Sequence, residues 1–364
     1  MKIIDVKTHA LSIPVDPPIY FATRVVPFRE FTVTQVFTDE GIVGQSTVPI
    51  GDPVSVAAIV DRKLRDVVVG KDPFATESLW DDMHRQMYRD RKGSAIRAIG
   101  AVDIALWDIK GKALGMPLHR LLGGDGSPVA CYASGGYYYQ GRELYNVATE
   151  MELYLEKGFE AMKMKVGAAS LEDDVARVRT AREIIGPDKV LLVDANNAYD
   201  APTAIKMGRR LEEYGVFFFE EPVKPNNLPG SRRVADALDI PIVSGELEYT
   251  LDGFRDLIDH GGVDMIQPDA TVLGGITEFL KVAALARAYH LPVAPHWEQE
   301  VHMHLVGALP NALFVEYFTK EINVRVEDQL YVDFVEPVDG KLPLPQAPGL
   351  GMELQPGVLD RYRI

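Results

Sequence analysis

The chain has 364 residues, of which 47% are hydrophobic and 25% are charged, and its formal net charge is −15 at pH 7. This length and hydrophobic content are enough for one large core and a smaller second one, such as a barrel of about 250 residues with an added domain. The negative charge argues against binding to nucleic acid or to anionic membranes, which attract basic surfaces, so we expect a small diffusible partner.

The amino terminus gives no sign of a targeting or membrane segment. Residues 1–7 alternate charged and apolar side chains. They are not followed by an apolar stretch and small residues, the pattern that is typical of a signal peptide. No apolar run reaches the length of about 18 residues that a membrane span needs. We therefore expect a protein that is neither secreted nor membrane-spanning.

The first 127 residues are predicted to form an α+β domain. Two stretches, 1–14 and 30–49, have strand-like patterns, and Asp39-Glu40-Gly41 offers a hairpin turn within the second. Three helical stretches follow, at 53–68, 73–89 and 94–114. Strands followed by consecutive helices indicate a unit separate from the alternating pattern that comes next.

Residues 128–320 alternate between strand-like and helix-like patterns. The predicted strands end near eight residues: Gly135, Lys165, Asp194, Glu220, Glu246, Asp269, His296 and Glu316. Alternating β and α units imply a parallel sheet, and eight such strands close into a barrel. No strong helix follows Glu316, so the eighth helix is expected to be incomplete, and residues 321–364, rich in Pro and Gly, are expected to return over the surface towards the first domain.

Cys131, the only cysteine, lies in the first of these strands. Its apolar surroundings predict a buried core thiol rather than a nucleophile. Because no intrachain disulfide is possible, we expect a reducing, cytoplasmic location.

Three acidic residues, Asp194, Glu220 and Glu246, end successive apolar runs at equal gaps of 26 residues (220 − 194 and 246 − 220). Carboxylates at adjacent strand ends converge, and hard cations prefer oxygen ligands. Helix capping or pairing with lysines is the alternative. Three negative charges at one barrel mouth need a cation to be tolerated, so the spacing predicts a Mg²⁺ site with room for water and a substrate oxygen.

Lys163 and Lys165 share one face of the second barrel strand, because strand side chains alternate with a period of two. Two ammonium groups beside each other and near a bound cation suffer like-charge repulsion, which is expected to lower at least one lysine pKa and so provide a base. The alternative is a pair of solvated lysines at a strand end. The apolar character of the strand makes that alternative weaker.

His296 and Asp269 end neighbouring predicted strands. An aspartate that accepts from one imidazole nitrogen leaves the other nitrogen as an acid or base, so we predict a catalytic pair, although a lone histidine is more often structural. Glu316 is expected either to hydrogen-bond a substrate oxygen as a carboxylic acid or to pair with a lysine. His302 and His304 fall in a predicted helix, where residues i and i+2 face different directions, and are expected to be structural.

The segment 16–24 is expected to reach over the barrel mouth. Within it, Arg24 could pair with a distal carboxylate or bind sugar hydroxyls, and Tyr20 adds polar reach; a surface role is the alternative. Pro49 and Ile50, in a second covering loop, would instead suit an apolar group.

Together these residues resemble the mandelate racemase subgroup of the enolase superfamily over nearly the whole chain. The matching pattern is Lys163-x-Lys165, Asp194 with Asn196, Glu220-Glu221-Pro222, Gly245-Glu246, Asp269, His296 and Glu316. The resemblance implies a (β/α)₇β TIM-type barrel behind an N-terminal α+β capping domain. The cycloisomerase and dipeptide-epimerase subgroup is different, because it has a lysine where this chain has Asp269.

The resemblance also implies roles for these residues. Mg²⁺ would be bound by Asp194, Glu220 and Glu246. Lys165 and the His296–Asp269 pair would be acid/base groups, and Lys163, Glu316 and Asn196 would lie at the substrate. We also expect a homo-oligomer.

The predicted chemistry is removal of the α-proton of a small carboxylate substrate, which needs a base together with stabilisation of the charge that develops. A β-hydroxyl on the substrate would leave, giving a 2-keto-3-deoxy acid, whereas a substrate without one would be racemised or epimerised. Because most of the subgroup are acid sugar dehydratases, we favour elimination. A non-catalytic barrel that binds metal and a small acid is a further alternative, but it would not need Lys165, Asp269 and His296 together.

Overall fold

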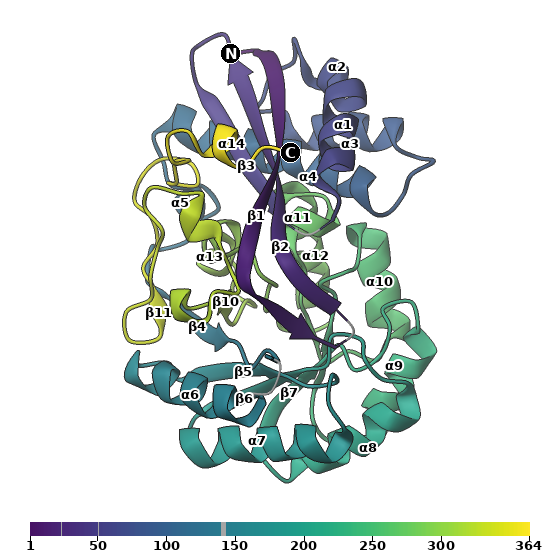
Figure 1. Cartoon of the computed structure of the whole chain (residues 1–364). Coiled ribbons are helices and arrows are strands. Elements are labelled where there is room, and N and C mark those ends of the chain that lie inside the picture. Colours follow the sequence, from purple (N-terminus) through teal and green to yellow (C-terminus); the bar gives the residue numbers. More distant parts are fainter. Residues whose placement is uncertain (23, 50, 140–142) are drawn as a thin grey trace.

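The computed structural model describes residues 1–22, 24–49, 51–139 and 143–364. It has an amino-terminal antiparallel sheet with its own helices and a barrel of parallel strands surrounded by helices (Figure 1). This mixed α/β architecture agrees with the fold predicted from the sequence.

The amino-terminal sheet has the strand order β1-β2-β3. Its strands are β1 (Ile3–Phe21), β2 (Arg24–Thr38) and β3 (Val43–Pro49). β1 and β2 pair as far as Phe21 with Arg24, with a break in register between Pro14 and Ile19, so the segment expected to be a covering loop is the end of one long hairpin. This end reaches the barrel, where Tyr20 and Tyr138 exchange backbone hydrogen bonds of 3.2 and 2.9 Å.

This part of the chain has helices of its own, several of which contact the sheet. They are α1 (Pro53–Ile59), α2 (Arg65–Val68), α3 (Thr76–Gln86), α4 (Ser94–Leu114) and α5 (Leu118–Leu121), with a π-helical stretch η1 (Val60–Leu64) between α1 and α2. The predicted helix 53–68 is therefore continuous but changes its winding in the middle. α4 lies very close to β3, because Gly44 has no side chain; a Cβ there would lie 2.1 Å from the carbonyl oxygen of Ala105.

The barrel sheet has the order β10-β4-β5-β6-β7-β8-β9. Its strands are β4 (Val129–Ser134), β5 (Ala161–Lys165), β6 (Val190–Asp194), β7 (Val216–Glu220), β8 (Ile242–Ser244), β9 (Met265–Ile266) and β10 (Val315–Tyr317). The strand predicted before His296 is reduced to Val293, which bridges Ile266 and Ala312 and so closes the ring. It is short because Pro292 and Pro295, which flank it, have no N–H to donate.

Helices follow the barrel strands as the alternating pattern predicts. They are α6 (Glu143–Glu156), α7 (Leu171–Ile185), α8 (Ala201–Glu212), α9 (Leu228–Ala235), α10 (Thr250–His260), α11 (Ala270–Leu273), α12 (Ile276–Ala288) and α13 (Gln299–Val306). After β10 the chain forms only short elements: η2 (Lys320–Ile322), η3 (Glu327–Gln329), β11 (Lys341–Leu342) and α14 (Val358–Arg361). Among the helices of the described residues, none is both long and apolar enough to cross a membrane.

An apolar layer fills the barrel interior. It consists of Tyr132, Ala161, Leu192, Phe218, Val243, Met265 and Ala294. Lys163, Asp194 and Glu220 each follow a member of this layer by two residues, so they point into the same barrel one step closer to its carboxyl-terminal end. Cys131 is buried as predicted, and burial raises the pKa of its thiol to about 12.

Candidate active site

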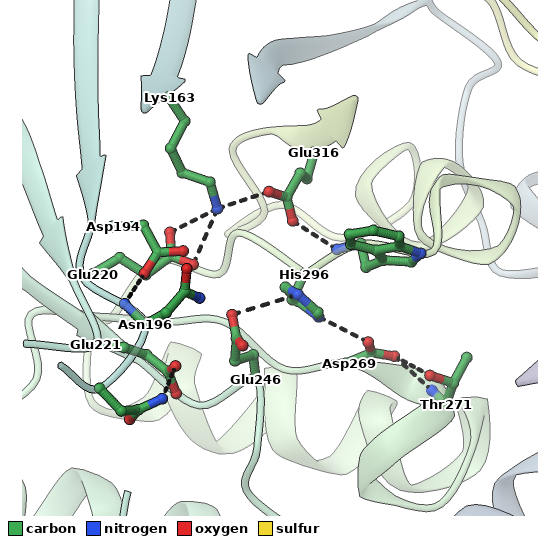
Figure 2. Close-up of polar contacts among 12 residues, drawn as sticks. Lys163, Asp194, Asn196, Glu220, Glu221, Glu246, Asp269, Thr271, His296 and Glu316 are labelled. Carbon is green, nitrogen blue, oxygen red and sulfur yellow. Dashed lines mark hydrogen bonds and ion pairs between the residues drawn. The ribbon is translucent and has the colours of Figure 1, made fainter. Parts of the chain in front are cut away.

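The polar residues at the carboxyl ends of the barrel strands converge on one point (Figure 2). One carboxylate oxygen each from Asp194, Glu220 and Glu246 lies within 4.8 Å of the others, and all three residues are buried. Burial and the charge of Asp194 raise the pKa of Glu220 to about 8, and Oε2 of Glu246 has no hydrogen-bond partner among the described residues. Three buried carboxylates that lie close together, one of them with an oxygen that accepts no hydrogen bond, fit a hard divalent cation such as Mg²⁺.

Lys163 is held between two carboxylates. Its Nζ lies 2.8 Å from Oε2 of Glu220 and 2.7 Å from Oε1 of Glu316, and the side chain is fully buried. Lys165, two residues on, forms an ion pair with Oδ2 of Asp194. Both lysines therefore point inward, as the period of two predicts.

The charges of the protein alone raise the pKa of both lysines, whereas the sequence argument, which included a bound cation, expected at least one to be lowered. Burial would lower both values, but Glu220 and Glu316 hold the pKa of Lys163 well above its usual range, and Asp194 does the same for Lys165. Because each lysine has its own carboxylate partner, attraction outweighs the repulsion between them.

His296 and Asp269 form the predicted pair. Nδ1 of His296 lies 3.0 Å from Oδ2 of Asp269, and Nε2 lies 3.4 Å from Oε2 of Glu246. Burial alone would lower the pKa of His296, but Glu246 and Asp269 raise this pKa to about 9. Thr271 orients the aspartate, because its N–H and its hydroxyl both donate to Oδ1 of Asp269, at 2.8 and 2.7 Å.

The sequence suggested that Glu316 could be a protonated carboxylic acid, but its surroundings favour the ionised carboxylate. Burial would raise its pKa, but Lys163 and His296 hold the pKa of Glu316 below its usual range, so it is an ionised acceptor. The backbone N–H of Trp297 donates to its Oε2 at 2.9 Å. The alternative, pairing with a lysine, describes this geometry better.

His302 and His304 lie in α13 and are structural, as expected. Nε2 of His302 accepts the backbone N–H of Ala270 at 3.0 Å, and His304 stacks on His119. Burial lowers the pKa of both α13 histidines to about 4, so both are neutral at pH 7.

A cavity of about 650 Å³ opens above these groups. The hairpin and β3 contribute residues such as Phe21, Arg24, Val25, Phe28, Arg29, Phe31 and Pro49, and the barrel contributes Tyr137, Lys165, Asn196, Lys224, Glu246, His296, Trp297, Glu316 and Phe318. Arg24, Asn196 and Pro49 thus line the cavity with the predicted acid/base groups. Ile50 lies outside the described residues.

Tyr20 does not line this cavity. It lines a neighbouring hollow of about 630 Å³ together with Pro18 and Tyr139, whereas Phe21 lines the cavity above the acid/base groups. Consecutive side chains of a strand point to opposite faces, so the extension of β1 to Phe21 turns Tyr20 away.

The sequence argument missed Arg29, Tyr137, Trp297 and Thr271. Tyr137 follows the first predicted strand end, at Gly135, by two residues, so the rule used for the other strands could have found it. Trp297 directly follows His296 and has a positive φ of 62°. Nothing in the sequence around Arg29 separates it from the other charged residues of its strand.

Two family models together match most of the chain. Residues 3–123 match the mandelate racemase / muconate lactonizing enzyme N-terminal domain, and residues 146–358 match the enolase C-terminal domain-like model. The chain belongs to the mandelate racemase/muconate lactonizing enzyme family. This result confirms the resemblance and the barrel fold inferred from the sequence.

Individual members of the family are similar over almost the entire chain. An arabinonate dehydratase of Saccharolobus solfataricus is 35% identical over 341 residues, which are 92% of this chain and 91% of that protein. A racemase from Streptomyces coelicolor A3(2) with bound magnesium has a TM-score of 0.92 and 30% identity, with 100% of both chains covered. A variant of L-talarate/galactarate dehydratase liganded with Mg and L-glucarate also has a TM-score of 0.92 and 30% identity, covering 100% of this chain and 92% of that one.

Proposed function

We propose that the protein is a Mg²⁺-dependent hydro-lyase that converts an acid sugar into a 2-keto-3-deoxy acid. The observation that carries the proposal is that Lys165 and His296, two separate acid/base groups, line one cavity around the carboxylates Asp194, Glu220 and Glu246. The dehydratases among the similar proteins support elimination, and the similar proteins with bound magnesium support the choice of cation.

Asp194, Glu220 and Glu246 would hold the cation. When bound, it would supply electrostatic stabilisation of the substrate carboxylate while the α-carbon loses its proton. Lys163 offsets one of the two negative charges of Glu220 and Glu316 and so reduces the repulsion that a further carboxylate meets.

Lys165 would take the α-proton with its Nζ after its ion pair with Asp194 has loosened and Nζ has released its own proton to solvent. His296, charged near neutral pH and fixed by Asp269, would donate its Nε2 proton to the β-hydroxyl. The electron pair of the C–H bond then forms a carbon–carbon double bond, the C–O bond breaks and water leaves. The resulting enol takes a proton at C3 and becomes the 2-keto acid.

Racemisation is the second candidate, because the same two groups could exchange the α-proton on opposite faces, and a racemase is among the similar structures. A non-catalytic binder is less well supported, since binding alone does not explain the Thr271–Asp269–His296 chain of hydrogen bonds. A cytoplasmic location and a homo-oligomeric state stay predictions.

The test is a screen of acid sugars with Mg²⁺ in D₂O, read by NMR and by semicarbazone formation. We expect a 2-keto product with one solvent deuteron at C3. Lys165→Ala and His296→Asn should each reduce turnover by about 10²- to 10⁴-fold while circular dichroism shows an intact fold. A change of configuration at C2 without keto product would establish the racemase instead, and no exchange with any acid would favour the binder.

A further inference from the structure

Arg29 of β2 crosses from the hairpin to the barrel and is fixed there by two contacts. Its Nε donates to the backbone carbonyl of Val324 at 2.9 Å, and its guanidinium lies over the ring of Trp297, 4.5 Å from the centroid. Trp297 in turn donates its backbone N–H to Glu316. Arg29 is therefore held rigidly beside the groups of the active site.

The charge of Arg29 has no carboxylate partner among the described residues. Glu327, the acid that most influences it, is already engaged by Nε of Arg325 at 2.9 Å and by the indole N–H of Trp297 at 2.7 Å. Nη2 of Arg29 is buried without a hydrogen bond, and burial lowers the pKa of the guanidinium. A half-buried guanidinium that has a buried, unpaired N–H and no ion pair is stabilised by an anion.

The Arg29 side chain lines the substrate cavity. Arg29 and Tyr137 both line it, and the two side chains interact. Tyr137 is buried, and its ring centroid lies 5.3 Å from Nζ of Lys165. Tyr137 thus contacts both the predicted base and Arg29, and among the described residues no hydrogen bond or ion pair joins Arg29 to Asp194, Glu220 or Glu246.

The outer wall of the cavity has an excess of positive charge. Arg24 and Lys224 line it, and neither forms an ion pair among the described residues. Of the lining acids, Glu246 belongs to the carboxylate triad and Glu316 is paired with Lys163, which leaves Glu30 as the acid of the outer wall.

We infer that Arg29, with Tyr137, binds a second carboxylate of the substrate, so that the preferred substrate is a dicarboxylic acid sugar. This inference rests on the proposed function. The reacting carboxylate would lie at the triad and Lys165, and the distal carboxylate would neutralise Arg29 through a charge-assisted hydrogen bond to its guanidinium. A terminal hydroxyl at the same place would leave the charge of Arg29 without a counter-ion.

The test compares mono- and dicarboxylic acids of matched configuration, such as galactonate with galactarate and gluconate with glucarate. We expect kcat/KM of the wild type to favour the diacid. Arg29→Gln should lower the diacid-to-monoacid ratio by about 10- to 100-fold, the effect of losing one hydrogen bond to a charged group, chiefly through KM. Arg29→Lys should give an intermediate ratio, and Lys7→Gln, which removes one exposed positive charge from the same sheet outside the cavity, serves as the matched control.

Binding to Lys165→Ala in the presence of Mg²⁺, measured by calorimetry, supplies a second readout that needs no turnover. Tighter binding of the diacid, lost in Lys165→Ala/Arg29→Gln, supports the inference. Equal binding of both acids, or an unchanged ratio in a folded Arg29→Gln protein, overturns it while leaving dehydration intact. If neither acid class is turned over, the proposed function fails, and the binding comparison still decides the role of Arg29. If Arg29→Gln does not fold, the wild-type preference and Arg29→Lys decide.

Discussion

Thr271 controls the orientation of Asp269, because its backbone N–H and its hydroxyl both donate to Oδ1 and leave Oδ2 free for His296. Thr271→Val removes one of these bonds and nearly preserves the volume. We expect kcat to fall by about tenfold, the effect of one lost hydrogen bond to a charged group, with a smaller change in KM.

Thr271→Ser, which retains the hydroxyl, is the matched control and should keep most of the activity. The measurement is kcat as a function of pH, because a loosened Asp269 should also lower the apparent pKa assigned to His296. An identical pH profile in the valine variant would show that Thr271 does not position the pair.

Glu246 is the triad member whose Oε2 has no hydrogen bond but lies 3.4 Å from Nε2 of His296, so Glu246→Gln removes a triad charge together with its attraction to the imidazolium. The metal-free protein should become more stable, because three crowded carboxylates become two. Loss of a residue that only supports a metal ligand lowers metal affinity by roughly 10- to 100-fold. Because Glu246 is itself a predicted ligand, Mg²⁺ affinity should fall by more than this. Thermal unfolding with and without Mg²⁺ measures both effects, and a variant that Mg²⁺ stabilises as much as the wild type would exclude Glu246 as a ligand.

Much of the candidate site could be predicted because strand periodicity is local. Lys163, Lys165, Asp194 and Glu220 all lie on the inward face of strands whose apolar residues reveal that face. Arg29 could not be predicted, since its role depends on Val324, 295 residues away in the sequence.

The protonation states also needed the structure. Whether two neighbouring lysines repel each other or are each paired depends on which carboxylates face them. Those carboxylates come from other strands, so the sequence of β5 alone cannot decide the pKa of Lys163 or Lys165.

At the scale of elements, α4 joins the capping sheet to the barrel through a buried carboxylate. Oδ2 of Asp103 accepts the backbone N–H of Thr277 at 2.9 Å, and Oδ1 accepts its hydroxyl at 2.6 Å, at the first turn of α12. Burial raises the pKa of Asp103 to about 7. The folded state therefore holds this proton more tightly than the unfolded state, in which the pKa is near 3.9.

This raised pKa predicts a pH dependence of stability. The contribution of Asp103 is fully present below pH 4 and is lost as the pH rises through about 7, because folding then requires a buried charge. Asp103→Asn should reduce the fall in the free energy of unfolding between pH 5 and pH 8, measured by urea denaturation. Some slope should persist, since burial also raises the pKa of Glu150 to about 7.

Asp66→Asn, in the short helix α2 and exposed, is the matched control and should retain the full slope. Equal slopes in the wild type and in Asp103→Asn would show that Asp103 stays ionised in the folded protein throughout this range.

The elements themselves were largely predictable from hydrophobic periodicity, and the exceptions have physical causes. The strand predicted before His296 is only a bridge at Val293, because prolines on both sides of it cannot donate backbone hydrogen bonds. The hairpin continued to Phe21 and Arg24 because its end gains backbone partners on the barrel, at Tyr138, and such a distant partner cannot be inferred from local pattern.

At the scale of the whole molecule, the end of the chain binds the first strand. Backbone hydrogen bonds join Ser12 to Tyr362 at 2.9 Å and Ile364 to Ala10 at 3.0 Å, and Val358 is buried beside them. Deleting residues 358–364 should lower Tm by roughly 3–10 °C, since burying one valine contributes about 1.5–3 kcal/mol and each kcal/mol shifts Tm by a few degrees.

Arg363→Ala is the control for this deletion. Its ion pair with Asp360 is exposed, and such pairs contribute little, so Tm should change by less than the deletion does. Scanning calorimetry measures Tm of both variants. An unchanged Tm in the protein that lacks residues 358–364 would show that these residues do not contribute to stability.

The long hairpin has a consequence for how this protein could change during evolution. The predicted proton-transfer groups are all in the barrel, whereas Arg24, Arg29 and the apolar side chains from Phe21 to Phe31 reach the same cavity from one hairpin near the start of the chain. Mutations in about a dozen neighbouring codons can therefore alter which acid is accepted while the reaction chemistry stays intact. A lineage could move from one nutrient to another through intermediates that all remain active.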